Sequence, residues 1–274
     1  MIALVVAVTT DQVELASDAL WALGVGAVEE RGSGNGVELW TSLGDDKRVV
    51  AESVASFPAA WQWRLEQVDE SVADTWREHA APTWIDQHLV VVPAWLPRTA
   101  DTAAGVIAVS IEPGSTFGLG DHPTTVLSLQ AVRDVVGRRP GCRVLDIGCG
   151  SGVLAIGAVM LGAASAHGID IAPASVAITT ANAGANGVGH AVTVATTPLA
   201  QIDGTYDVVV ANILAPTLIE LSADLVRVLA PGGTLIVSGI LEHRYGHVLD
   251  ALAPLQMTSC LTRAGWVAVS LAQP

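Results

Sequence analysis

The chain has 274 residues, of which 51% are hydrophobic, and it carries a formal net charge of -14. This length and apolar content suit one large globular domain or two unequal ones, and they exclude an intrinsically disordered chain. The acidic balance argues against binding modes that neutralise many nucleic-acid phosphates and favours a cationic partner. We therefore expect no direct nucleic-acid binding.

The sequence shows no secretory signal, no membrane-spanning segment and no cysteine motif that would indicate an oxidising compartment. The first residues, MIALVVAVTTDQ, lack the basic region of a secretory signal, so we expect no signal peptide. The longest apolar run, residues 152–166, is too short to span a bilayer and contains three glycines. Cys142, Cys149 and Cys260 form no CxxC pair and no metal-ligand cluster. These features predict a cytoplasmic protein with reduced thiols and without a membrane or metal site.

Residues 1–68 are predicted to form a small α+β domain with the element order β-α-β-β-α-β. The GSGNG segment is typical of a hairpin turn between its second and third strands. This order is the ferredoxin-like arrangement, which forms a compact domain of this size. From periodicity, strands are expected at 2–8, 25–30, 37–40 and 61–68, and helices at 13–23 and 47–56.

A connecting segment is predicted at residues 69–100. It should contain a helix, then a break at a proline, then the strand LVVV ended by Pro93. Seven of the eight tryptophans lie at or before Trp95. We expect their rings to anchor the small domain and its junction rather than to contact a partner.

Residues 101–274 are predicted to form a larger α/β domain. Most of its short apolar runs are separated by helix-length segments, which predicts a doubly wound, mostly parallel sheet. The tail should form two strands around Arg263-Ala264-Gly265, as a hairpin on the edge of this sheet. The five runs expected as its main strands are RVLDI, AHGID, AVTVA, YDVVVAN and GTLIVSG.

A glycine-rich loop, LDIGCGSG at 145–152, follows the first of these strands. Ligands of doubly wound sheets bind beyond the carboxyl ends of the strands. Gly148, Gly150 and Gly152 let the main chain turn sharply and approach a ligand closely. The spacing is not the G-x-G-x-x-G of dinucleotide enzymes, because residue 153 is Val, and no Gly-Lys-Ser/Thr of a P-loop is present.

Asp170 ends the next predicted strand, where an acid accepts hydrogen bonds from both hydroxyls of a ribose. The helix after the glycine loop offers N–H groups to a carboxylate. A ribose and a carboxylate without a pyrophosphate indicate S-adenosylmethionine. The alternative is a turn that serves only the fold, with Asp170 as an ordinary cap; the agreement of loop, acid and strand order favours the cofactor.

Six further stretches have a recognisable pattern: TWREHAAPTWIDQHLVVVPAW, IEPGSTFGLGDHPTT, LDIGCGSGVLAI, VVANILA, LAPGGTLIVSGIL and GWVAVSL. From about Asp69 to the end of the chain, they resemble the ribosomal protein L11 methyltransferase family. The segments with the pattern PGxxFGxGxHPTT and VVANIL are specific to that family, whereas many methyltransferases share the glycine loop.

The resemblance implies a ferredoxin-like substrate-recognition domain, a linker and a class I S-adenosylmethionine domain. It implies methylation of lysine side chains and of the N-terminal amine of ribosomal protein L11, by an enzyme that we expect to be a monomer. This chain has Gly118-Leu119-Gly120 where the family commonly has Gly-Thr-Gly, and Ala172 where it has a second acid. With Gly150 from the loop argument, the expected cofactor contacts are Phe117, Gly118, Thr125, Gly148, Gly150, Asp170 and Asn212.

Asn212 is the candidate catalytic residue, because its amide oxygen can accept the N–H bonds of an amine and aim the lone pair at the methyl group. The text Asn-Ile-Leu-Ala lacks the stacking aromatic of the Asn-Pro-Pro-Tyr sequence found in enzymes that act on planar groups. The alternative is that Asn212 serves only as a turn residue.

We expect His122 to be a hydrogen-bonded loop residue rather than a proton acceptor. Glu112 stays unassigned, and Cys149 is expected to be a small packing residue.

Three other functions stay open at this point. The same cofactor could serve another protein amine or a small-molecule amine. A non-catalytic module could bind adenosylmethionine and assemble with ribosomal particles. An NAD-dependent oxidoreductase is the least favoured, because the glycine spacing differs from the dinucleotide pattern.

Overall fold

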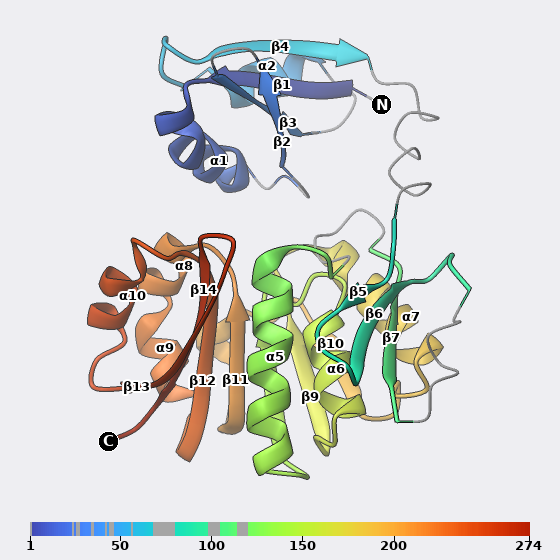
Figure 1. Ribbon diagram of the computed structural model, residues 1–274. Coiled ribbons are helices and arrows are strands. Elements are labelled where there is room, and N and C mark those ends of the chain that lie inside the picture. The colour runs from blue at the N-terminus through green and yellow to red at the C-terminus, as the bar shows by residue number, and fades with distance from the viewer. Residues whose placement is uncertain are drawn as a thin grey trace. The chain divides into compact units, whose positions relative to one another are not determined.

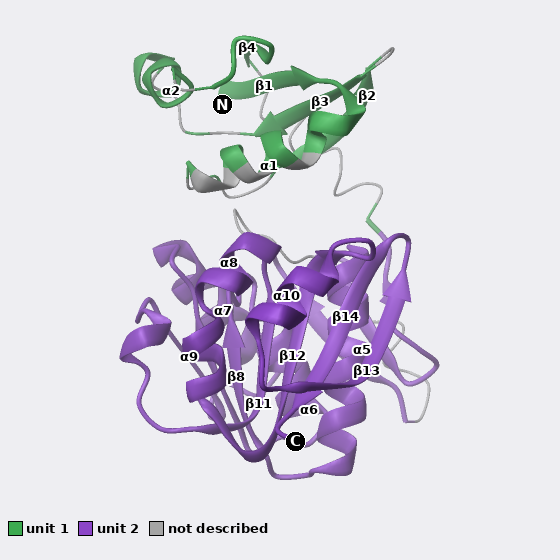
Figure 2. Cartoon of the chain, turned by 90° about the vertical axis from the view of Figure 1, so that its left-hand side faces the viewer, with its two compact units in different colours: residues 1–80 green, residues 81–274 purple. Residues whose placement is uncertain are grey.

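The structure is a computed structural model that describes residues 2–23, 25, 28–33, 36–41, 43, 47–55, 57–67, 80–97, 105–113 and 120–274. The chain divides into two compact units, residues 1–80 (unit 1) and 81–274 (unit 2), coloured separately in Figure 2. The connecting helix expected between them falls largely on residues 68–79, which lie outside the described residues.

Unit 1 is a four-stranded antiparallel sheet in the order β2-β3-β1-β4, with two helices packed on one face. This is the predicted ferredoxin-like arrangement. Its elements are β1 (Ile2–Val8), η1 (Thr10–Gln12), α1 (Val13–Ala22), β2 (Glu29–Ser33), β3 (Gly36–Thr41), α2 (Lys47–Ser53) and β4 (Gln62–Gln67).

The core of unit 1 follows from the alternation of side chains along β1. Leu4 and Val6 point to the helical face and pack with Leu20 of α1 and Val50 of α2, all at most 1% exposed. Full burial of such a side chain contributes about 1.5–3 kcal/mol to folding. The hydrophobic interior therefore lies between the sheet and the two helices.

The opposite face of this sheet carries charged and aromatic side chains. The Arg31 guanidinium lies 4.0 Å from the centroid of the Trp40 ring. Arg64 makes two hydrogen bonds to the Glu38 carboxylate, at 2.9 and 3.0 Å. Hydrogen bonding to Glu38 and Glu66 raises the pKa of Arg64. These pairs compensate each other's charge on this face.

One predicted strand of unit 1 is wrong in its position. The strand expected at 25–30 is β2, which begins at Glu29 and ends at Ser33. It pairs with β3, with Glu29 opposite Trp40 at one end and Ser33 opposite Gly36 at the other. Val25 instead packs into the core at 6% exposure. All side chains of β2 are exposed, so the apolar pattern favoured the wrong residues.

The tryptophans differ in burial: Trp61 is buried, whereas Trp63 and Trp84 are 41% and 47% exposed.

Unit 2 contains a seven-stranded sheet in the order β10-β9-β8-β11-β12-β14-β13 (Figure 1). The neighbouring strands from β10 to β12 pair in parallel, whereas β14 pairs antiparallel with both β12 and β13. This is the doubly wound sheet with an edge hairpin that the sequence predicts. Its strands are β8 (Arg143–Ile147), β9 (Ser165–Ile169), β10 (Val192–Ala195), β11 (Tyr206–Asn212), β12 (Leu229–Leu241), β13 (Gln256–Arg263) and β14 (Trp266–Ala272).

Helices cover both faces of this sheet and form two hydrophobic clusters. The first cluster joins α5, α6 and α7 to one face, and the second joins α8, α9 and α10 to the other. Along β8, Val144 belongs to the first cluster and Leu145 to the second, as strand alternation requires. The helices are α5 (Pro123–Arg138), α6 (Val153–Met160), α7 (Pro173–Ala185), η3 (Leu199–Gln201), α8 (Ala215–Glu220), α9 (Ser222–Arg227) and α10 (Tyr245–Ala251).

A separate three-stranded sheet, β5-β6-β7, packs on the α5–α7 side of unit 2. It consists of β5 (Thr83–Trp84), β6 (Leu89–Pro93) and β7 (Ile107–Ile111). The sequence predicted only β6. Gln130 of α5 donates a 3.0 Å hydrogen bond to the carbonyl of Ile85, and Arg133 pairs with Asp86, so this hairpin is tied to α5.

Candidate functional site

The carboxyl ends of three neighbouring parallel strands bring three of the predicted residues together. Ile147 at the end of β8 pairs with Ile169 of β9 on one side and with Ala211 of β11 on the other. Gly148, Asp170 and Asn212 each come one residue later. The strand order reverses between β8 and β11, and this switch point is where doubly wound sheets bind ligands.

Glycine is required in the loop between β8 and α6. Gly148, Gly150 and Gly152 have φ of 71°, 53° and 81°, a left-handed conformation that other residues rarely adopt. A Cβ on Gly148 would lie 2.4 Å from Cγ2 of Ile213. Gly148 is exposed, although the strand before it is buried. Its bare main chain therefore faces the switch point.

The Asp170 carboxylate is held in one orientation by main-chain groups. Its Oδ2 accepts from the N–H of Gly150 at 2.8 Å, and its Oδ1 accepts from the N–H of Ala172 at 2.9 Å. Each carboxylate oxygen can accept a further hydrogen bond, which leaves room for two hydroxyls. The Gly150 N–H is thus engaged within the protein and holds this acid.

Ile171, directly after Asp170, is a residue that the sequence reasoning missed. Its side chain is 93% exposed, the most exposed large hydrophobic residue among those described. An apolar side chain beside Asp170 offers a surface to a flat, apolar ring. The signal was an isoleucine at a strand end that no core position required.

The other acid of the glycine-loop motif, Asp146, is a buried residue at 0% exposure. Its Oδ2 accepts from the N–H of Ala155 in α6 at 3.0 Å, and its Oδ1 has no partner in the described part of the chain. Desolvation raises the pKa of this carboxyl to about 7, against the hydrogen bond from Ala155. Asp146 therefore anchors the helix after the loop.

Cys149 packs beneath the loop. Its Sγ lies 3.9 Å from Oγ1 of Thr179 in α7, which itself donates a 3.0 Å hydrogen bond to the carbonyl of Gly150. Burial, followed by the charge of Asp146, raises the pKa of this thiol. A buried thiol of raised pKa is a poor nucleophile.

The start of α5 presents an unpaired hydroxyl. His122 caps the helix: its Nδ1 accepts from the N–H of Thr124 at 3.3 Å, and burial lowers the pKa of the ring. The ring also meets Trp266 edge-on, with centroids 5.2 Å apart. Thr125 is 1% exposed, and its Oγ1 has no hydrogen-bond partner in the described residues. A buried hydroxyl without a partner is costly unless a ligand completes it.

Asn212 is half-buried at the end of β11. The turn after it is fixed by close packing, because a Cβ on Gly239 would lie 2.4 Å from the carbonyl oxygen of Ile213. Ile213 is thus held between two glycines, Gly148 and Gly239. Phe117 and Gly118 lie outside the described residues.

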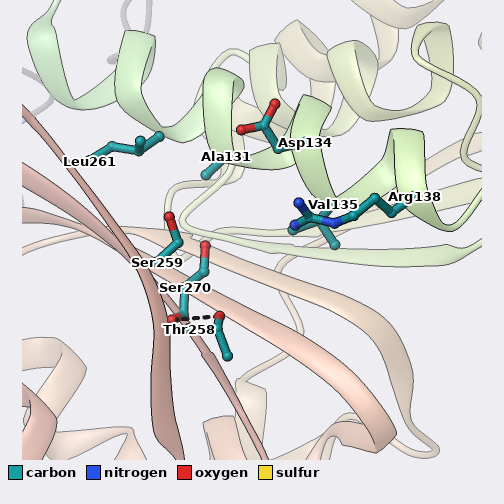
Figure 3. A pocket seen from close by; sticks show the side chains of 8 residues that line it. All are labelled: Ala131, Asp134, Val135, Arg138, Thr258, Ser259, Leu261 and Ser270. Carbon is teal, nitrogen blue, oxygen red and sulfur yellow. Dashed lines mark hydrogen bonds between the residues drawn. The ribbon is translucent and has the colours of Figure 1, made fainter.

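A cavity of about 350 Å³ lies elsewhere in unit 2, between the second half of α5 and the β13–β14 hairpin (Figure 3). Ser259 and Ser270 point from the hairpin toward α5, and Thr258 Oγ1 donates to the carbonyl of Ser270 at 3.1 Å. The cavity lies along residues 131–138 of α5, whereas Thr125 is in the first turn of that helix. This cavity includes none of the predicted site residues.

No group of three His, Cys, Asp or Glu side chains in the described part of the chain is arranged to hold a metal ion. Within the same residues, no helix is both long and apolar enough to cross a membrane.

Comparison with known proteins gives consistent matches. The sequence profile of the family described as "Ribosomal protein L11 methyltransferase" matches residues 44–274. Proteins of that name from Geobacter metallireducens and Geobacter sulfurreducens are 44% and 47% identical over 190 and 182 residues, or 69% and 66% of this chain. These matches span 61% and 58% of the relatives' own lengths. A solved ribosomal protein L11 methylase from Lactobacillus delbrueckii subsp. bulgaricus superposes with a TM-score of 0.65 at 30% identity, covering 71% of this chain and 98% of that one.

Proposed function

Because the chain belongs to the ribosomal protein L11 methyltransferase family, we propose that it transfers methyl groups from S-adenosylmethionine to amino groups of ribosomal protein L11. The acceptors in this proposal are lysine side chains and the N-terminal amine. The observation that carries it is the meeting of Gly148, Asp170 and Asn212 at the carboxyl ends of neighbouring parallel strands.

The described residues fit a nucleoside with an amino-acid tail. Asp170 has one acceptor site per oxygen left for the ribose hydroxyls, and Ile171 offers an apolar side chain to the adenine. The unpaired Oγ1 of Thr125 suits the carboxylate of the tail. The exposed main chain of Gly148 allows the close approach that this binding needs. Phe117 and Gly118 belong to the same proposed cofactor site.

Methyl transfer requires mainly that the protein align the acceptor amine with the methyl group and keep that amine in its neutral form. When bound, S-adenosylmethionine supplies a methyl group that its sulfonium already activates. A lysine with a pKa of about 10.4 costs roughly 4–5 kcal/mol to deprotonate at pH 7. Burial of the amine beside a positive charge disfavours the ammonium form and offsets part of this cost.

We assign the orientation of the amine to Asn212. Its side-chain oxygen accepts an N–H bond of the amine, so that the nitrogen lone pair points away from the strand end and toward the methyl group. The fixed turn at Ile213 holds the main chain of Asn212 in place. An aliphatic residue follows Asn212, so a flexible aliphatic amine suits this site better than a planar group that would need a stacking ring.

Recruitment of the protein substrate is assigned to the N-terminal part, with residues 1–68 as the recognition domain and 101–274 as the methyltransferase domain. Of the predicted linker, residues 69–100, the part that forms β5 and β6 belongs to unit 2. The net charge of -14 favours encounter with a basic ribosomal protein. A variant without residues 1–80 should keep its affinity for S-adenosylhomocysteine and lose methylation of L11. Unchanged methylation would refute the recruitment role.

The activity itself is tested by incubating the protein with labelled S-adenosylmethionine and purified L11, followed by peptide mapping. We expect label on lysine residues and the N-terminal amine. Label on a different amine in a mixture of candidate acceptors would replace the substrate, and binding without transfer would reject catalysis. An enzyme for a ribosomal protein works where ribosomes are, so we place it in the cytoplasm, as a monomer that light scattering can verify.

A further inference from the structure

Two asparagines one helical turn apart, Asn182 in α7 and Asn186 at its C-cap, bind the edge of strand β7. Asn182 Oδ1 accepts from the N–H of Glu112 at 3.0 Å, and its Nδ2 donates to the carbonyl of Glu112 at 2.9 Å. Asn186 makes the same pair of bonds to Ser110, at 2.8 and 2.7 Å. Each side-chain amide thus takes the place of one residue in a neighbouring strand.

The spacing of helix and strand makes this pairing work. Residues two apart on a strand are separated by about 6.6 Å, and residues four apart on a helix by about 6 Å. Ile107 and Ile111 hydrogen-bond toward the β6 side, so the main-chain groups of Ser110 and Glu112 face α7. The helix therefore completes the hydrogen bonding of a sheet edge that would otherwise stay open.

Asn182 makes one bond that Asn186 does not make. Its Nδ2 also donates to the carbonyl of Ser151 in the glycine loop at 2.9 Å, and Asn182 is 3% exposed. The corresponding bond of Asn186 goes to the carbonyl of Asn182 within its own helix, at 2.8 Å. Only the first asparagine of this pair joins the main chain after β7 to the glycine loop.

We propose that Asn182 is a positioning residue for the cofactor, because it fixes the glycine loop against the main chain at Glu112. The inference rests on the proposed function, in which the glycine loop binds S-adenosylmethionine. Two carbonyl oxygens and one N–H converge on this side chain, and an amide supplies the required two donors and one acceptor. Aspartate lacks the donors, and alanine lacks all three groups.

The matched pair Asn182→Ala and Asn186→Ala tests the proposal in the full chain. Each variant loses three side-chain hydrogen bonds, so both should lower the melting temperature of the protein without ligand. Calorimetric titration with S-adenosylhomocysteine should show a Kd raised roughly ten-fold or more for Asn182→Ala, and changed less than about two-fold for Asn186→Ala. Equal Kd values for the two variants would overturn the proposal and leave Asn182 a purely structural residue.

A measurement on the unaltered protein keeps the proposal falsifiable if Asn182→Ala fails to fold. Binding of S-adenosylhomocysteine should slow hydrogen exchange of the Glu112 amide more than that of the Ser110 amide, because only Glu112 shares its asparagine with the glycine loop. Equal slowing, or none, would reject the coupling. If the unaltered protein does not bind S-adenosylhomocysteine at all, the proposed function fails, and this result is read separately from either variant.

Discussion

The main-chain N–H of Gly150 donates a 2.8 Å hydrogen bond to the carboxylate of Asp170. This bond joins the loop after β8 to the end of β9 and, with the N–H of Ala172, sets the orientation of the carboxylate before any ligand arrives. A pre-oriented acceptor loses less conformational entropy on binding. The glycine loop and the acid therefore act as one unit.

Removal of the acid should weaken the cofactor selectively. Asp170→Ala deletes the acceptor that we propose for two ribose hydroxyls, and hydrogen bonds to a charged group are each worth about 1.5–3 kcal/mol. We expect the Kd for S-adenosylmethionine to rise at least about ten-fold, while the KM for L11 stays unchanged. Asp203→Ala, which removes an exposed acid, is the control. A Kd equal to that of the unaltered protein would remove Asp170 from the site.

Alanine substitutions at two glycines with the same backbone conformation should distinguish the cost of backbone strain from the cost of a steric clash. Gly148 and Gly187 have φ of 71° and 72°, but only a Cβ on Gly148 meets a neighbour, at 2.4 Å from Ile213. Gly187→Ala should lose about 1–2 kcal/mol of stability from the left-handed conformation alone. Gly148→Ala should lose more and should also weaken cofactor binding, as thermal unfolding and titration will show. Equal losses would mean that Ile213 yields without cost.

The buried carboxyl of Asp146 predicts a pH dependence of stability. Its pKa of about 7 in the folded protein exceeds the ordinary value of 3.8. Between these values the unfolded chain releases a proton that the folded protein keeps, so the contribution of this group to stability falls as pH rises and is constant above about pH 7. The total change is about 4 kcal/mol.

Asp146→Asn removes this titration. The difference in free energy of unfolding between the variant and the unaltered protein should shift in favour of the variant from pH 4 to pH 7. Asp134→Asn, on the exposed side of α5, controls for the loss of one charge. Parallel stability curves for Asp146→Asn and the unaltered protein across this range would contradict the assignment.

Asn212→Ala should affect turnover more than affinity. The side chain is assigned to the acceptor amine, so its loss should lower kcat by about 100-fold or more, in the range of a lost positioning or electrostatic contact. The Kd for S-adenosylhomocysteine should change by a much smaller factor. Single-turnover measurement of methyl transfer separates the two effects. An unaltered kcat would return Asn212 to the role of a turn residue.

Much of the fold was predictable because buried parallel strands are continuous apolar runs. YDVVVAN became β11 with the expected limits, Tyr206–Asn212. Two strands escaped or shifted because they lack this signal: β5 is only two residues long and depends on its pairing with β6, and β2 has all its side chains exposed. β7, the apolar run IAVSI, carries the signal and was missed all the same.

The placement of the candidate site was predictable because parallel strands end at the same edge of a sheet. Gly148, Asp170 and Asn212 meet there for that reason. Asn182 was not predictable, because an asparagine within a helix normally indicates a polar surface position. Its partner Glu112 lies 70 residues earlier in the sequence, and only the packing of β7 on α7 brings the two together.

The most direct measurement is a crystal structure of the protein with S-adenosylhomocysteine. The account predicts the nucleoside at the switch point between β8 and β11, with both ribose hydroxyls on the Asp170 carboxylate and the main chain of Gly148 against the ligand. A nucleoside bound at another place, such as the cavity between α5 and the β13–β14 hairpin, would contradict it.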